Sequence, residues 1–471
     1  MFNISDTICA ICTPKGTGAI SVIRISGTES WKIGQKIFSQ TQYPILNTQY
    51  SFEHMYAQHG YIKDNDKTID EVIILPYKAP NSFTTEDTVE IFCHGGLQVT
   101  SQVLDLCLKH GVRQAKNGEF TFRAFVNGRI DLTEAEAINE IISADNEKAV
   151  SIASQILSGS LKDKIVGFRE KLLNLITSIE SSVEFPMDIA DMSKEEVVAN
   201  LKNIQSEIGE LIKDSREGLL LREGIKVSIV GPTNAGKSSL LNQLLESERA
   251  IVSDEPGTTR DTVEEKILID GWSVILVDTA GIREKDSASK SEKMGIERSK
   301  QSIQNSDIVL GVFDLTNKSH DQSEFSNLIK DKSKIIIGNK VDLVDTSNIS
   351  KNGFDILISA KNGDNITQLK KLLIEKASSL FNTRHSILPL EARLAKGGNT
   401  QYCYINQRQK ELLIQCNSAI ENSTDLANKN ISEDLISDEL KNAISKLDEI
   451  SGRTISDEVI KNIFAKFCIG K

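Results

Sequence analysis

The chain has 471 residues, of which 39% are apolar and 26% charged, and its formal net charge is −11. At roughly 150 residues per domain, this length predicts about three domains, each able to bury a core of its own. The acidic balance disfavours general nucleic-acid binding, because neutralisation of phosphates dominates such affinity, so any RNA binding must rest on local basic patches or on a second protein.

The sequence shows no sign of a membrane segment. No stretch approaches the roughly 18 uninterrupted apolar residues that a spanning helix needs. The beginning, MFNISDTICAI, has neither the basic start of a signal peptide nor the arginine-rich character of a transit peptide. We therefore expect a cytoplasmic protein without a membrane partner.

Seven cysteines are scattered along the chain, a pattern that favours reduced thiols over a disulfide framework. Cys9 and Cys12 are formally a C-x-x-C pair, but they lie in an expected strand, where positions i and i+3 face opposite sides. No second pair or histidine cluster completes a metal site. Of the six histidines, only His94, in CHGG, attracts attention, and a structural role is favoured for it.

Residues 1 to 128 predict a separate α+β domain. Short stretches of alternating apolar and polar residues indicate strands at 20–25, 71–75 and 88–92. A helix is expected at 96–110. Strands mixed with helices in this way are typical of an α+β domain rather than a helical bundle.

The spacing of apolar residues changes near residue 129. Apolar residues recur at intervals of three and four through 129–221, with a break at Pro186, and they do so again in 381–471. These two stretches predict long antiparallel helices that form one all-α domain. Residues 222–380 lie between them and are best explained as an inserted domain, since insertions are tolerated where chain ends lie close together.

The inserted segment begins with a nucleotide-binding motif. An apolar strand at 227–230 leads into GPTNAGKS, residues 231–238, which matches G-x-x-x-x-G-K-[ST] between a strand and a helix. Gly231 and Gly236 allow backbone N–H groups to point at phosphate oxygens, and the start of the helix adds its positive dipole end. We expect Lys237 to reach the β- and γ-phosphates and the Ser238 hydroxyl to bind Mg²⁺.

Three further motifs each follow an apolar strand. They are DTAG at 278–281, NKVD at 339–342 and SAK at 359–361. Asp342 can accept two hydrogen bonds from groups that guanine has and adenine lacks, so the motifs predict a GTPase in an α/β P-loop fold. The residues that these motifs predict to contact GTP are Asn234, Ala235, Gly236, Lys237, Ser238, Ser239, Asp278, Thr279, Ala280, Gly281, Asn339, Lys340, Asp342, Ser359, Ala360 and Lys361.

Ile282 follows the second motif directly, where small GTPases often have a glutamine that orients the attacking water. A branched aliphatic side chain cannot do this, so the transition state must be stabilised by other means. The following stretch, 283–300, contains Glu284, Glu292 and Glu297. From the residues alone, an exposed helix charge is the favoured explanation for any one of the three.

Several stretches together resemble one family over essentially the whole chain. They are DTICAICTPKGTGAISVIRISG, NSFTTEDTVEIFCHGG, GEFTFRAFVNGRIDLTEAEA, the nucleotide motifs with GTTRD, and LDEISGRTISDEVIKNIFAKFCIGK. This sequence resembles the tRNA-modification GTPases of the MnmE (TrmE) type, above all in the final FCIGK. Related GTPases of ribosome assembly share the nucleotide motifs but lack both that tail and the first domain.

The resemblance implies a homodimer formed through the first domain, a site for 5-formyl- or methylene-tetrahydrofolate, and an FAD-dependent partner protein that uses NADH. A heterotetramer would install an aminomethyl or carboxymethylaminomethyl group at C5 of the wobble uridine of certain tRNAs. Cys468 takes the position of the cysteine implicated in modification. The implied folate contacts are Arg24, Glu90, Arg129 and Lys471, and family members more often have lysine at the position of Arg129.

For the nucleotide site the resemblance implies dimerisation across the nucleotide faces and K⁺ in place of an inserted arginine. Glu292 becomes the favoured residue to orient the water. Thr259 would join Ser238 on Mg²⁺, and the loop reads GPTN where the family usually has proline directly before the asparagine. The implied K⁺ ligands are Asn234, Ser253, Glu255 and Thr258. The implied further GTP contacts are Ser253, Asp254, Glu255, Pro256, Gly257, Thr258 and Thr259.

A GTP-dependent conformational switch, such as a ribosome-assembly factor without modification chemistry, is the alternative hypothesis. It explains residues 222–380 equally well. It does not explain Arg24 and Glu90 in the first domain, or Cys468 and Lys471 at the end of the chain. Folate binding by the first domain would discriminate between the two hypotheses.

Overall fold

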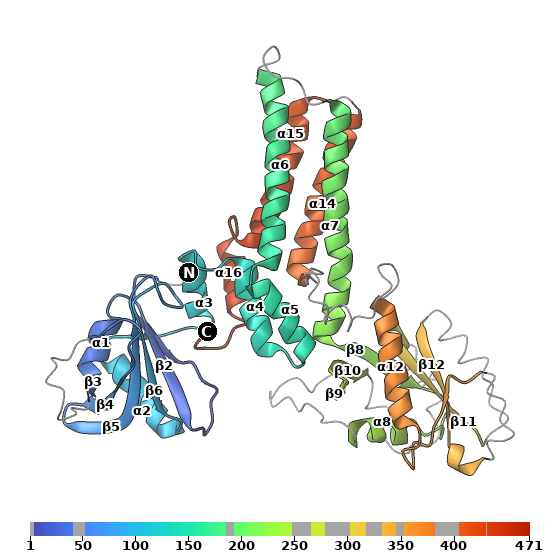
Figure 1. Ribbon diagram of the computed structural model, residues 1–471, viewed down its shortest axis with the longest axis horizontal. Coiled ribbons are helices and arrows are strands. Elements are labelled where there is room, and N and C mark those ends of the chain that lie inside the picture. Colours follow the sequence, from blue (N-terminus) through green and yellow to red (C-terminus); the bar gives the residue numbers. More distant parts are fainter. Residues whose placement is uncertain are drawn as a thin grey trace. The chain divides into compact units, whose positions relative to one another are not determined.

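The computed structural model divides into two compact units. The first contains Met1–Asn139, Ile156–Gln205 and Glu411–Lys471, and the second contains Glu140–Gln155 and Ser206–Lys410. The chain thus leaves the first unit and returns to it (Figure 1). The residues that the structure describes are 4–40, 52–184, 193–246, 265–277, 302–316, 332–344, 353–381, 405–429 and 431–471.

The first domain is built on a seven-stranded sheet in the order β3-β4-β5-β6-β2-β1-β7 (Figure 1). Neighbouring strands are antiparallel except for the parallel pair β1 and β7. The predicted α+β fold of this domain is confirmed. Its elements are β1 Ile8–Ile11, β2 Ile20–Ser26, α1 Ser30–Ile37, β3 Phe38–Gln40, β4 Gln58–Asp64, β5 Lys67–Tyr77, β6 Thr88–His94, α2 Leu97–Lys109 and β7 Arg113–Gln114.

Alternation along the strands separates the core of this domain from its functional face. On β2, Ile23 and Ile25 are fully buried in the cluster that α1 and α2 cover. Arg24, between them, faces the opposite side of the sheet, as the period of two requires. It lies directly across from Glu90 on β6. The same alternation buries Cys9 in the core and leaves Cys12 half-buried on the other face.

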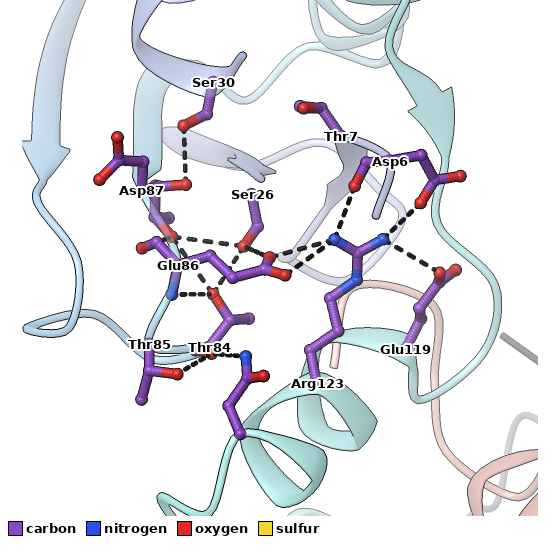
Figure 2. A network of polar contacts seen from close by, with 12 residues as sticks. Asp6, Thr7, Ser26, Ser30, Thr84, Thr85, Glu86, Asp87, Glu119 and Arg123 are labelled. Carbon is purple, nitrogen blue, oxygen red and sulfur yellow. Dashed lines mark hydrogen bonds and ion pairs between the residues drawn. The ribbon is translucent and has the colours of Figure 1, made fainter. Parts of the chain in front are cut away.

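A network of charges holds the edge of this domain together (Figure 2). The side chain of Arg123, on α3 (Glu119–Val126), is completely buried. Its guanidinium lies 2.7 Å from Asp6 Oδ1 and 3.1 Å from Glu86 Oε1, and 3.5 Å from Glu119 Oε1. Arg113 also pairs with Asp6 and Glu119. Burial acts to raise the pKa of Asp6, but the two arginines outweigh it and hold that pKa below its ordinary value.

The helices predicted from the apolar spacing are present. Within the first unit, α6 packs along α15, and the Arg169 guanidinium forms an ion pair with Asp448 at 2.8 Å. Lys194, near the start of α7, donates to the Asn428 carbonyl oxygen at the end of α14 at 2.9 Å. The helices are α4 Leu132–Ser143, α5 Glu147–Leu157, α6 Ser160–Glu184, α7 Lys194–Glu223, α14 Gln407–Asn428, α15 Glu433–Ser451 and α16 Asp457–Phe464.

The second unit contains a six-stranded sheet in the order β13-β12-β11-β8-β10-β9. All neighbours are parallel except β9, which is antiparallel to β10. The predicted inserted α/β domain is therefore confirmed. Its elements are β8 Ile225–Val230, α8 Lys237–Glu246, β9 Glu265–Ile269, β10 Trp272–Val277, β11 Ile308–Asp314, β12 Ser333–Asn339, the 3₁₀ helix η1 Val341–Leu343, β13 Ile356–Leu357 and α12 Ile366–Phe381.

The strand order of this sheet also indicates where a ligand binds. The chain passes from β8 to β10 on one side and then to β11 on the other. Ligands of open parallel sheets bind at such a switch point, outside the carboxyl ends of the strands. The glycine-rich loop that follows β8 lies at this point.

The predicted boundaries at residues 128, 221 and 380 stay predictions. Residue 128 falls between α3 and α4, whereas 221 falls inside α7, which continues to Glu223. Among the residues that the structure describes, no helix combines the length and the apolarity needed to cross a membrane.

Substitution of Arg123 tests the charge network. Arg123→Met would leave the fully buried carboxylate of Glu119 and its neighbours without this cation, so we expect a loss of about 3–5 kcal/mol in the free energy of unfolding. The chain's two tryptophans are Trp31 and Trp272. Urea unfolding followed by Trp31 fluorescence, in a Trp272→Phe background, therefore reports on this domain.

Arg113→Met is the matched control for this measurement. The Arg113 side chain is 34% exposed, so its loss removes a weaker interaction and should cost less than half as much. Equal midpoints for Arg123→Met and the unsubstituted protein would contradict the role given to Arg123.

Candidate functional site

The glycine-rich loop takes its shape from two close approaches. Gly231 has φ 154°, and a Cβ there would collide with the backbone oxygen of Val312 on β11. Gly236 has φ 91°, and a Cβ there would collide with the Asn339 side-chain nitrogen. Both positions therefore require glycine. Asn234, between them, has φ 60°, a left-handed conformation that asparagine tolerates, and its side chain is exposed.

Lys237 begins α8 and folds back over this loop. Its Nζ donates to the carbonyl oxygens of Gly231 and Pro232 at 2.9 and 2.7 Å. Burial lowers the pKa of Lys237 from its ordinary value. Ser238 and Ser239 are exposed in the same first turn of the helix. The ammonium group thus lies at the loop that the motif predicts to hold phosphates.

Asn339 joins three of the predicted motifs. Its side chain is buried, donates from Nδ2 to the Ala235 carbonyl oxygen at 2.8 Å, and accepts from the Ala360 N–H at 2.9 Å. One amide thus fixes the glycine-rich loop against residues 359–361. The motifs that were separate in the sequence meet at one edge of the sheet.

The predicted base-recognition end is assembled around Asp342. Its Oδ1 accepts a hydrogen bond from the buried Ser359 hydroxyl at 2.6 Å, while the residue itself is exposed. Lys340 is in the left-handed region with φ 68°, and its Nζ lies 2.6 Å from Asp314 Oδ2. Lys361 is exposed. The hydrogen bond from Ser359 therefore orients the Asp342 carboxylate, which remains exposed at the surface.

Asp314, at the end of β11, was not predicted. Burial acts to raise its pKa, but the hydrogen bonds from Lys340 and Thr316 outweigh it and hold the pKa below its ordinary value. A carboxylate at the carboxyl end of a parallel strand was the signal that could have found it. Several predicted residues lie outside the described ones: Ser253, Asp254, Glu255, Pro256, Gly257, Thr258, Thr259, Asp278, Thr279, Ala280, Gly281 and Glu292.

A second site is a cleft of about 600 Å³ in the first domain. Arg24, Glu90 and Arg129, three of the four implied folate contacts, line it together. Arg24 contacts Glu90 Oε1 through Nε at 2.9 Å and through Nη2 at 2.8 Å. Tyr77 donates its hydroxyl to Glu90 Oε2 at 3.3 Å. Burial, followed by the negative charge of Glu90, raises the pKa of Tyr77 above its ordinary value.

The loop before β6 also lines the cleft. The Phe83 carbonyl oxygen accepts from Arg129 Nη1 at 3.1 Å, and the Thr84 carbonyl oxygen accepts from Asn127 at 2.7 Å. Glu86, in the same loop, is held by Arg123 (Figure 2). Sequence reasoning did not find Phe83 or Tyr77, since an aromatic residue in a loop or a strand carries no motif.

The C-terminal tail is packed against the first domain. Phe464 and Phe467 are buried in a cluster with Phe122. Gly118 has φ 66°, and a Cβ there would lie 2.6 Å from the Phe464 backbone oxygen. The tail is therefore held in place and is not a frayed helix end. Buried apolar contacts fix the segment that leads to the last four residues.

The last four residues form a turn on β1. The Lys471 N–H donates to the Cys468 carbonyl oxygen at 3.3 Å, and Gly470 has φ 96°. A Cβ on Gly470 would collide with the backbone oxygen of Ile11. The Cys468 side chain is exposed.

Lys471 does not line the cleft, but it lies beside a residue that Arg24 also contacts. The Lys471 carbonyl oxygen accepts from the Phe120 N–H at 3.2 Å, and the Arg24 guanidinium carbon lies 5.5 Å from the centroid of the Phe120 ring. Burial raises the pKa of the nearby Cys12 thiol, while the charges of Arg24 and Lys471 act to lower it.

The switch point, the glycine-rich loop and the guanine-type motif define a P-loop GTPase domain, here inserted in a helical domain. The description "GTP-binding protein TrmE N-terminus" belongs to the family model that matches residues 7–129, and "MnmE helical domain" to the one that matches 132–468. The chain belongs to the MnmE family of tRNA modification GTPases.

Individual relatives agree with this assignment. The tRNA modification GTPase MnmE of Pseudothermotoga lettingae is 38% identical, over 99% of this chain and 100% of its own. The protein of the same name from Moorella thermoacetica is 39% identical over the same shares. The solved structure of Aquifex aeolicus Era is 25% identical, covers 41% of this chain and 66% of its own, and superposes with a TM-score of 0.25, too low to bear on the fold.

Exchange of the Asp342 carboxylate tests the predicted base site. In Asp342→Asn an amide donor replaces an acceptor, so affinity for GTP should fall about 100-fold or more while affinity for xanthosine triphosphate rises. Competition against a fluorescent guanine nucleotide measures both. An equal loss for the two nucleotides would mean that Asp342 supports the loop and does not read the base.

Proposed function

We propose that this MnmE-family protein is a K⁺-stimulated GTPase that modifies C5 of the wobble uridine of certain tRNAs in the cytoplasm. It would act with an FAD-dependent partner that uses NADH, as a homodimer within a heterotetramer. The product would be an aminomethyl or carboxymethylaminomethyl group whose carbon comes from 5-formyl- or methylene-tetrahydrofolate. Membership of the MnmE family supports the function of a tRNA-modifying GTPase. The cleft in the first domain is the observation that supports the folate-dependent chemistry.

The residues of the cleft fit a folate. Its volume of about 600 Å³ is in the range of small-molecule sites, and most of the side chains that line it are polar or charged. Glu90 can accept from the 2-amino and N3–H edge of a pterin, while the guanidiniums of Arg24 and Arg129 can meet a carbonyl or a carboxylate. When bound, the folate would supply the one-carbon unit.

Cys468 fits a role in the modification rather than in GTP hydrolysis. Its thiol is exposed, on a tail whose backbone is held by Gly118 and Phe120 of the first domain. The tail therefore presents a thiol at a fixed place beside the sheet that carries the cleft. The thiol would act on C6 of the uridine or as a proton donor in the transfer.

For hydrolysis, Asn234 fits a K⁺ ligand. Asn234 has a left-handed backbone conformation and an exposed side chain. It lies three residues before Lys237, in the loop predicted to hold the phosphates. Ser238 would bind Mg²⁺ together with Thr259, and Glu292 would orient the water. K⁺ between the phosphates would neutralise developing charge, which compensates for Ile282 in place of a glutamine.

The decisive experiment compares tRNA from cells with and without this protein by nucleoside mass spectrometry. Loss of the C5 modification of wobble uridines supports the proposal. Unchanged nucleosides, with a ribosome-assembly defect in their place, would favour the switch hypothesis.

Hydrolysis should depend on K⁺. In Na⁺ at equal ionic strength we expect turnover to fall on the order of 10³-fold, the size of effect that an arginine finger supplies. Asn234→Ala should remove the response to K⁺ while retaining GTP affinity, because the K⁺ ligand acts in the transition state. Rates that are the same in the two salts would refute this part of the proposal.

The two activities should separate at Cys468. Cys468→Ser should hydrolyse GTP at close to the original rate and abolish wobble modification in cells. The reason is that the thiol lies on the tail, which packs against the first domain, where the cleft lies. Ile469→Ala, a change at the adjacent exposed residue, is the matched control and should retain modification. Full modification by Cys468→Ser, or a parallel loss of GTPase activity, would contradict the separation.

A further inference from the structure

Phe83 is an aromatic residue of the cleft wall that no motif explains. It lies in the loop between β5 and β6, and its half-buried ring packs against the cluster around Phe122 and against a second cluster around Phe120. These two contacts fix the position of the Phe83 ring. Its remaining surface is part of the cleft.

Two cations lie over this ring. The guanidinium carbon of Arg24 is 5.0 Å from the ring centroid and that of Arg129 is 4.9 Å from it. The two guanidinium carbons are therefore no more than about 10 Å apart and repel each other. The negative face of an aromatic ring attracts both cations, and this attraction grows as water is excluded. Phe83 thus offsets the repulsion at the place where the two cations converge.

The two arginines differ in what else they contact. Arg24 forms an ion pair with Glu90, so most of its charge is neutralised. Arg129 contacts the Phe83 carbonyl oxygen and ring, and among the described residues no carboxylate lies within 4.0 Å of it. Arg129 is therefore the cation of this cleft that can meet a ligand carboxylate without first breaking an ion pair.

We propose that Phe83 is a positioning residue: its ring orients the Arg24 and Arg129 guanidiniums, so that Arg129 binds the glutamate carboxylate of the folate while the Arg24–Glu90 pair faces the pterin. This inference rests on the proposed folate site. It adds a direction for the ligand and a residue that acts through two others.

The test uses the full chain and isothermal titration with 5-formyltetrahydrofolate. Phe83→Leu keeps an apolar side chain but removes the ring, and we expect affinity to fall on the order of tenfold, whereas Phe83→Tyr keeps the ring and should restore it. Phe38→Leu, the same change in the other core of the domain, should leave affinity unchanged. The corresponding tetrahydropteroate, which lacks the glutamate, should lose less than twofold in Phe83→Leu.

Each outcome has a distinct meaning. If the unsubstituted protein binds no folate, the proposed function fails at this site, and the inference falls with it. If the unsubstituted protein binds but Phe83→Leu binds equally well, only the inference is overturned. Equal losses in Phe83→Leu and Phe83→Tyr, or for both ligands, would show that Phe83 supports packing and does not orient Arg129.

Discussion

One buried guanidinium ties together three distant parts of the first domain. Arg123 is completely buried, and its partners Asp6, Glu86 and Glu119 come from the start of the chain, from the loop before β6 and from α3 (Figure 2). Removing one partner of a buried charge is costly, because the remaining charges stay desolvated. The three segments must therefore be in place together, and this fixes the loop that carries Phe83.

In the nucleotide domain, a neutral buried side chain joins separate segments of the chain. Asn339 joins the glycine-rich loop to residues 359–361 through two hydrogen bonds of one buried amide. An amide fastens backbone groups without adding charge to the site. Lys237 then contacts only backbone carbonyls, among the contacts described for it, and its charge is not neutralised by a carboxylate of the loop. A loop that binds phosphates benefits from that arrangement.

The sequence allowed prediction of whatever is encoded locally. A motif at the end of an apolar strand must lie at the carboxyl edge of a parallel sheet, and so Asn234, Asn339 and Ser359 could be brought together in advance. Alternation on β2 likewise separates Arg24 from the core. The family resemblance supplied Lys471, which spacing could not, and the structure shows it beside Phe120 rather than in the cleft lining.

What could not be predicted depends on pairing across long stretches of chain. Asp6 and Arg123 are 117 residues apart, and no local pattern marks either as a partner of the other. Phe83 and Tyr77 belong to the cleft only because β5, the following loop and α3 converge there. The ion pair of Asp314 with Lys340, as distinct from the place of Asp314 at a strand end, required knowledge of which strand lies beside β12. Tertiary pairing decides each of these positions, and composition and periodicity carry no record of it.

The tail shows how far apart the parts of one site can lie in the chain. Asn117 and the Ala465 carbonyl oxygen are separated by 348 residues, yet they are in hydrogen-bonding contact. Gly118 accommodates the backbone of Phe464, and β1 receives Gly470. Lys471 thus lies beside Phe120, whose ring Arg24 also contacts. The nucleotide domain lies between these contacts in sequence, so the first unit reaches its full set of interactions only when Glu411–Lys471 has been added to the two earlier segments. The geometry beside the cleft therefore depends on the folding of the helices that precede the tail.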